Sequence, residues 1–142
     1  MKAILRSILA ILAGLAVMLL LIIAVEAFSA VVYPLPADFK GTTEEMCAHV
    51  EHYPPWILAV VVPAWGFAGL ASAWTARRIG NTYSAAIVGL LMLLALVSNL
   101  AMLPYPTWFK AANLLVIPLA LIAGTRLASR SKSTSAEVAP KE

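Results

Sequence analysis

The stretch Ile4–Val25, ILRSILAILAGLAVMLLLIIAV, decides the fold, because a single charge, at Arg6, interrupts an otherwise apolar run. About 20 apolar residues are enough for a helix to cross the hydrocarbon core of a bilayer. A signal peptide also starts with a basic residue, here Lys2, but its apolar region is only about 7 to 15 residues long. Pro34 ends the run, since proline cannot donate the helical hydrogen bond. We therefore expect an uncleaved first span over residues 4–33.

The composition of the whole chain supports this interpretation. Of the residues, 62% are hydrophobic and 12% charged, whereas soluble domains are roughly half apolar and a quarter charged. Three further apolar runs predict spans at about 56–76, 83–103 and 108–127, with one long outer loop at 34–55. The sequence thus predicts an all-α, four-helix transmembrane bundle over 1–128, running up-down-up-down. The tail, 129–142, is too polar to pack and is expected to be disordered.

The basic residues predict the orientation. Eight of the ten fall at one side of the predicted spans, against Lys40 and Lys110 at the other. The eight are Lys2, Arg6, Arg77, Arg78, Arg126, Arg130, Lys132 and Lys141. Since loops with excess Lys and Arg stay in the cytoplasm, we expect a multi-pass protein of the bacterial inner membrane with both termini cytoplasmic. Tryptophans and tyrosines at the opposite span ends fit an aromatic belt at the outer interface.

The outer loop contains a candidate metal site. Thr42 or Thr43 is placed to cap a short helix from Glu44 to about His52. The candidate ligands are Glu45, Cys47, His49 and His52, and carboxylate, thiolate and imidazole suit zinc or copper. Their spacing matches no standard zinc motif, and histidines in a wet loop are usually solvated. We expect no cofactor, with zinc or copper at this loop as the alternative.

A second candidate site lies inside the predicted bundle. Glu26 lies about 10 Å below the end of its span, and Asn99 and Asn113 lie about 7 and 8 Å below the ends of theirs, by the helical rise. One interpretation is a polar pocket that opens outward, with Glu26 as proton acceptor or cation ligand and Trp65 as its floor. The other is interhelical hydrogen bonding, worth under about 1 kcal/mol per contact. Both interpretations stay open on the sequence, and hydrogen bonding is the commoner case.

Small residues recur along the second span at Ala64, Gly66, Ala68, Gly69 and Ser72. Such residues let helix backbones approach closely in lipid. They predict a helix-packing surface, either within the bundle or in a homo- or hetero-oligomer.

Short pieces of the chain resemble a group of small four-span bacterial inner-membrane proteins. They are Trp65-Gly66, Asn99-Leu100 and the P-x-P-x-W-F turn at Pro104–Phe109. The resemblance implies the same four-span layout, but the group has no assigned activity. Small multidrug transporters are also similar in having four short spans and a membrane carboxylate. Here the carboxylate is near the outer end and the outer loop is long and acidic, so their function is not carried over.

Three functions are compatible with these observations. The chain lacks the nucleotide-binding glycine loop, G-x-S-x-G, H-E-x-x-H and a basic nucleic-acid surface. We therefore expect a non-enzymatic accessory or scaffold subunit, whose partners are the lipid bilayer and other membrane proteins. The alternative is binding or transport of a small cation, proton or lipophilic solute through the pocket around Glu26. A third hypothesis is a membrane enzyme that uses Glu26 with His49 or His52.

Overall fold

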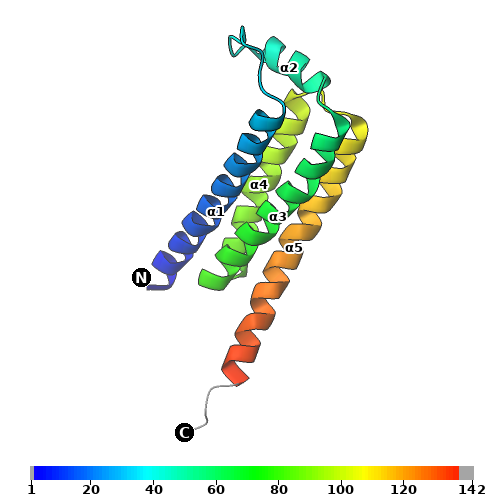
Figure 1. Ribbon diagram of the computed structural model, residues 1–142. Coiled ribbons are helices and arrows are strands. Elements are labelled where there is room, and N and C mark those ends of the chain that lie inside the picture. Colours follow the sequence, from blue (N-terminus) through cyan, green and yellow to red (C-terminus); the bar gives the residue numbers. More distant parts are fainter. Residues whose placement is uncertain (1, 138–142) are drawn as a thin grey trace.

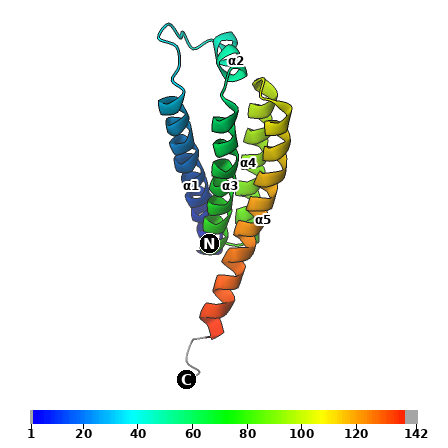
Figure 2. The same ribbon diagram turned by 45° about the vertical axis from the view of Figure 1, so that its right-hand side comes forward.

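The protein is a bundle of four long helices with a short helix across one end (Figure 1). The computed structural model describes residues 2–137, with side chains as far as Arg130. The elements are α1 (Lys2–Val32), α2 (Thr43–Glu51), α3 (Pro55–Ile79), α4 (Thr82–Met102) and α5 (Thr107–Glu137). Successive long helices run in opposite directions, and α2 lies across the end where α1 finishes and α3 begins (Figures 1 and 2). The predicted all-α, up-down-up-down bundle is confirmed.

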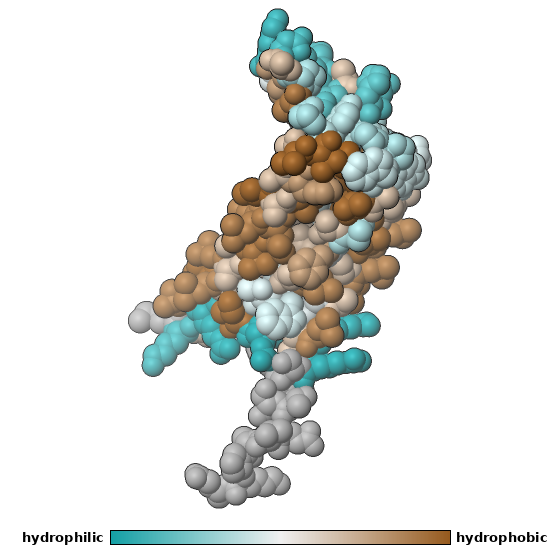
Figure 3. All heavy atoms as spheres, in the orientation of Figure 1, coloured by the Kyte–Doolittle hydropathy of each residue, from teal (hydrophilic) through white to brown (hydrophobic). Residues whose placement is uncertain are grey.

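All four long helices are long and apolar enough to cross a membrane. The surface shows why these helices suit lipid: a hydrophobic band covers the middle of the bundle and hydrophilic residues gather at both ends (Figure 3). On α1, the large aliphatic side chains that point away from the bundle include Leu12, Leu20 and Ile23, each more than half exposed. A surface of this kind is stable in a bilayer and aggregates in water.

The helix ends follow local sequence signals. Pro55 occupies the first turn of α3, where its missing amide hydrogen costs nothing. Asn81 caps α4 by accepting a hydrogen bond from the backbone nitrogen of Ser84 at 3.0 Å. The largest difference from the sequence prediction is in α5, which continues to Glu137 through residues expected to be disordered. No proline or glycine interrupts 125–137, and the rest of the predicted tail, 138–142, lies outside the described residues.

Helix α3 is the centre of the bundle. It contacts α1, α4 and α5, most extensively α5 and α1. The approach to α5 is so close that a Cβ atom at Gly124 would overlap the backbone of Leu70. On the other side, a Cβ atom at Gly14 of α1 would lie 2.9 Å from the Cβ atom of Ala76. Because glycine has no side chain, Gly124 and Gly14 allow α5 and α1 to pack closely against α3.

The small residues of α3 are used in this packing. Gly66, Ala68, Gly69 and Ser72 are buried within the chain, and Ala64 is half-buried. The hydroxyl of Ser72 donates to the carbonyl oxygen of Gly69 at 2.9 Å, so it needs no polar partner on another helix. The predicted oligomer through this span stays a prediction, because the described structure is a single chain.

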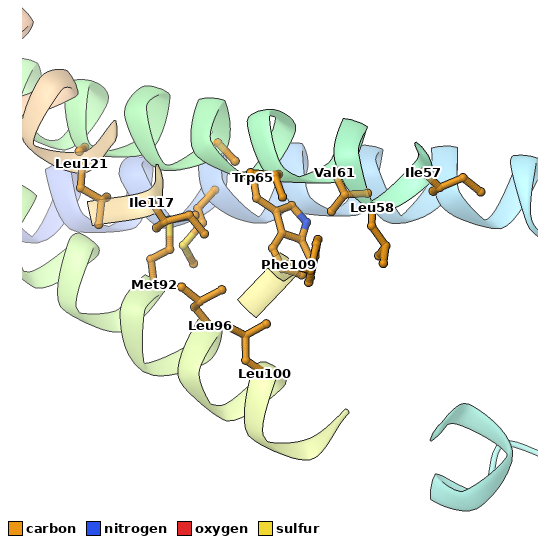
Figure 4. Close-up of a cluster of buried hydrophobic side chains, with 14 residues drawn as sticks. Ile57, Leu58, Val61, Trp65, Met92, Leu96, Leu100, Phe109, Ile117 and Leu121 are labelled. Atoms are coloured by element: carbon orange, nitrogen blue, oxygen red, sulfur yellow. The ribbon is translucent and has the colours of Figure 1, made fainter. Parts of the chain in front are cut away.

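The hydrophobic core is formed mainly by α3, α4 and α5, and Met18 of α1 also belongs to it. The rings of Trp65 and Phe109 meet edge to face with their centroids 5.8 Å apart. From α4, Met92, Leu96 and Leu100 point toward this aromatic pair (Figure 4). The core therefore surrounds Trp65, the deepest of the candidate site residues.

Candidate functional site

A cavity of about 170 Å³ opens between α1 and α4, with α3 and α5 behind it. Its walls follow helical spacing, because residues four apart lie on one face of a helix. It is lined by Met18, Ile22 and Glu26 of α1, Trp65 of α3, Met92, Ala95, Leu96 and Asn99 of α4, and Ile117 of α5. The structure thus places three of the four predicted pocket residues, Glu26, Trp65 and Asn99, along one cavity.

The fourth residue, Asn113, is fully buried and is not among the lining residues. Its amide nitrogen donates to the carbonyl oxygen of Phe109 at 2.9 Å, one turn earlier on α5. It shares a helix face with Phe109 and Ile117, which lie four residues to either side. Asn113 therefore lies on the α5 face that packs toward the cavity.

Three buried polar atoms around the cavity have no hydrogen-bond partner within the described residues. They are the indole nitrogen of Trp65 and the side-chain oxygens of Asn99 and Asn113. Leaving such an atom unpaired costs about 1 to 3 kcal/mol, so most buried polar groups in native structures have partners. Two of the three unpaired atoms, one donor and one acceptor, belong to residues that line the cavity.

Two tyrosines lie within electrostatic reach of Glu26. Burial raises the pKa of Tyr53, and the negative charge of Glu26 adds to this effect, whereas a hydrogen bond with Ser29 opposes it. Burial also raises the pKa of Tyr105, with Glu26 again contributing. Both hydroxyl groups therefore belong to the surroundings of the Glu26 carboxyl at the end of the bundle that carries α2.

Above these residues, an aromatic cluster joins α1 to α2. The rings of Tyr33 and His49 stack with centroids 4.5 Å apart, and His49 meets Tyr53 edge to face at 5.4 Å. Because Tyr33 follows α1 and Tyr53 precedes α3, these contacts hold the end of α1 and the start of α3 against α2.

Helix α2 is fixed by its own capping box. Thr42 accepts a hydrogen bond from the backbone nitrogen of Glu45 at 3.3 Å, and Glu45 accepts one in return from that of Thr42 at 3.3 Å. The same carboxylate accepts a hydrogen bond from the backbone nitrogen of Lys40 at 2.8 Å. Glu45 thereby organises the loop before α2 as well as the helix.

The four candidate metal ligands are not gathered into one cluster. Glu45 serves the capping box, His49 stacks on Tyr33, and a ring nitrogen of His52 lies 2.8 Å from the carbonyl oxygen of Ala48. The thiol of Cys47 points to the carbonyl oxygen of Met102 at 3.7 Å. Within the described part of the chain, no three His, Cys, Asp or Glu side chains are placed to hold a metal ion.

The histidines are also separated from Glu26. His49 and His52 line a shallow outer hollow with Asp38 and Glu45, whereas Glu26 lines the cavity between α1 and α4. The imidazoles and the Glu26 carboxyl thus line different hollows, whereas the enzyme hypothesis requires them to meet in one cleft.

Sequence reasoning missed the two tyrosines and the apolar walls. Tyr53 and Tyr105 lie where tyrosines of an interfacial aromatic belt are expected. Their position in the sequence therefore gave no reason to connect them with Glu26. The wall formed by α1 could have been predicted, because Met18, Ile22 and Glu26 are spaced by four residues and therefore lie on one face of the helix.

No protein-family model matches the chain, and neither a curated protein nor a solved structure matches it. The function must therefore be argued from the cavity. Its chemistry is that of a mostly apolar pocket whose polar lining residues are Glu26, Trp65 and Asn99. Such a pocket suits reversible binding of a molecule with an apolar body and a small polar head.

Proposed function

We propose that the protein binds a small lipophilic solute in the outer cavity between α1 and α4. The observation that carries the proposal is a cavity of about 170 Å³ with mostly apolar walls, which Glu26, Trp65 and Asn99 line together. Such a cavity would take an apolar body along its walls, with the side chain of Glu26 next to a small polar head. The charge distribution supports placing the protein in a bacterial inner membrane with both termini in the cytoplasm, so that the cavity opens to the outer leaflet.

The position of the cavity supports entry from the lipid. Its two front walls, α1 and α4, belong to different hairpins of the chain, and both carry exposed apolar side chains such as Ile23 and Val97. A solute dissolved in the outer leaflet would reach Glu26 without crossing water. The accessory-subunit role stays a prediction, because no contact in the single chain specifically favours it.

The test is crosslinking of a photoreactive long-chain alcohol to the protein in lipid nanodiscs, with the labelled residues mapped by mass spectrometry. We expect labels on Met18, Ile22, Met92 or Leu96. Replacing Asn99→Leu removes the unpaired acceptor and fills space, so labelling should fall at least tenfold while the folded protein keeps or gains thermal stability.

The matched control is Ser98→Ala, since Ser98 is the exposed neighbour of Asn99 and does not line the cavity. Labelling of Ser98→Ala should equal that of the unmodified protein. Labels spread evenly over the lipid-facing surface, or unchanged in Asn99→Leu, would refute a binding site in this cavity.

A further inference from the structure

We propose that the protein binds an anionic phospholipid on α5, at the end of the bundle where α1 begins. The site is a groove lined by Leu119, Ile122, Ala123, Arg126, Leu127 and Arg130. None of these residues lines the cavity around Glu26, so the proposal does not rest on the proposed function. It follows from the order of the side chains along the groove, their exposure and the charge at this end of the bundle.

The groove follows one face of α5, because Leu119, Ile122, Arg126 and Arg130 are spaced by three or four positions. The apolar side chains come first along the helix and the two arginines follow. By the helical rise, Arg126 lies about 10 Å along the axis from Leu119, and Arg130 about 16 Å. This order matches a phospholipid, whose acyl chains would lie beside the apolar side chains while its phosphate lies at the arginines.

The side chains of the groove are accessible from outside the bundle. Leu119 is 65% exposed, Ile122 49% and Leu127 48%. Both arginines are exposed as well. A lipid molecule can therefore reach the groove from the side, without any displacement of a helix.

The arginines lie at the depth where lipid phosphates are expected. The part of α5 that is apolar enough to cross a membrane, Thr107–Arg130, ends at the second of them. The side chain of Arg77 donates to the hydroxyl oxygen of Ser129 at 3.2 Å, which places this part of α5 beside the last turn of α3. Hydrophilic residues gather at this end, next to the hydrophobic band (Figure 3). A guanidinium group at this depth can bind a phosphate through two parallel hydrogen bonds.

The charge at this end of the bundle favours an anionic head over a zwitterionic one. The described basic residues there are Lys2, Arg6, Arg77, Arg78, Arg126 and Arg130. Five of the seven acidic residues lie between positions 26 and 51, and the other two, Glu137 and Glu142, lie beyond the described side chains.

Among its described side chains, the groove therefore offers no carboxylate to the amine of an ethanolamine or choline head. A phosphodiester with an uncharged glycerol head brings only the negative charge that the arginines match. With the topology proposed above, the groove faces the cytoplasmic leaflet, where anionic lipids attract basic segments.

The experiment titrates the full-length protein, in a neutral detergent, with phosphatidylglycerol, phosphatidylethanolamine or phosphatidylcholine of identical acyl chains. Native mass spectrometry counts the lipid molecules that stay bound. We expect phosphatidylglycerol to bind at least tenfold more tightly than either zwitterionic lipid. Inorganic phosphate at the same concentrations should not displace it, because the free anion has no acyl chains to lie along Leu119 and Ile122.

Variants of the arginines locate the site. The double variant Arg126→Gln with Arg130→Gln should lose at least tenfold in affinity for phosphatidylglycerol, because both positive charges of the groove are gone. Arg126→Gln alone should lose part of that affinity, and it keeps the test available if the double variant does not fold. Size-exclusion elution and thermal unfolding establish which variants are folded.

The matched control is Arg78→Gln, which removes the same charge from the same end of the bundle but lies in the last turn of α3, outside the groove. Its affinity for phosphatidylglycerol should stay within twofold of that of the unmodified protein. In nanodiscs, phosphatidylglycerol with a photoreactive acyl chain should label Leu119, Ile122 or Leu127, as mapped by mass spectrometry.

Three results would overturn the proposal. Equal affinities for phosphatidylglycerol and phosphatidylcholine would show that the head group is not selected. An equal loss in Arg78→Gln and in the arginine variants of α5 would show a general attraction to positive charge instead of a site. Displacement of the lipid by inorganic phosphate would show an anion site to which the apolar side chains contribute nothing.

Discussion

At the level of single residues, the outer end of the bundle brings tyrosine hydroxyls close to a membrane carboxyl. Burial and the charge of Glu26 raise the pKa values of Tyr53 and Tyr105, and Ser29 holds Tyr53 by a hydrogen bond. Folding therefore favours the protonated form of both tyrosines. Deprotonating either one would create a second negative charge near Glu26 in a poorly hydrated place.

This arrangement predicts a loss of stability in alkali. A tyrosine whose pKa is higher in the folded than in the unfolded state holds its proton more tightly when folded. Its contribution to stability is complete below the unfolded pKa of about 10 and is lost as the pH rises through the folded-state value. Thermal unfolding in detergent between about pH 8 and about pH 12 should show a falling midpoint above about pH 10, and the fall should be shallower in Tyr105→Phe.

The control for this prediction is Tyr83→Phe, because Tyr83 is 81% exposed at the opposite end of the bundle. Its pH profile should follow that of the unmodified protein. Equal slopes in Tyr105→Phe and the unmodified protein would show that Tyr105 does not contribute.

The residues of the site were only partly predictable from the sequence. Glu26 and Asn99 are polar in apolar runs, and Trp65 lies too deep for a belt residue, so each stands out without a structure. Tyr53 and Tyr105 do not stand out, because the interface favours tyrosine whether or not a site lies beneath it. Asn113 was assigned a similar depth by the helical rise, but depth along a helix does not say which way a side chain faces.

At the level of elements, the bundle depends on how closely α5 approaches α3. A methyl group at Gly124 would meet the backbone of Leu70, which cannot rotate aside as a side chain can. Gly124→Ala must therefore push the two helices apart and should cost about 1 to 3 kcal/mol, as other overpacked core substitutions do. Unfolding of the purified protein in a series of denaturing detergent mixtures measures this change.

A matched glycine substitution serves as the control. At Gly89 of α4, an added Cβ atom would lie 3.5 Å from the nearest atom, on the side chain of Leu121, which is ordinary contact. Gly89→Ala should be neutral or stabilising, because alanine is the better helix former by about 1 kcal/mol. The prediction for Gly124 is wrong if both substitutions have the same effect.

The elements were more predictable than the site. Hydropathy and the prolines placed the first three spans and the start of the fourth to within a few residues, and Thr42 was one of two candidates for the cap of α2. The length of α5 was not predicted, because a polar composition suggests disorder even where no residue breaks the helix. The small-residue stripe indicated close packing, but the partner helices can be read only from the fold.

At the level of the whole molecule, the two ends of the bundle differ in charge. The described basic residues at the end where α1 begins include Arg6, Arg77 and Arg126, whereas the acidic outer loop lies at the end carrying α2. We therefore predict that Cys47 faces the periplasm. In intact cells, a membrane-impermeant maleimide should label Cys47, the single cysteine of the chain.

A second variant tests the opposite end of the bundle by placing the single cysteine there. In a Cys47→Ser background, Thr82→Cys at the exposed start of α4 should be labelled only after the membrane is permeabilised. The reverse pattern would invert the proposed topology and place the cavity in the inner leaflet.

The central position of α3 determines the order in which the helices can pack while the chain is being synthesised at the ribosome. Helix α1 leaves the translation machinery first but finds its main neighbour only after the outer loop and α3 have been made. Helix α4 follows, and α5, the last to emerge, covers the face of α3 that carries Trp65 and Leu70. Until α5 arrives, that face of α3 is uncovered, so a chain cut short before Thr107 would have the first three long helices yet lack the part of the cavity wall that Ile117 of α5 supplies.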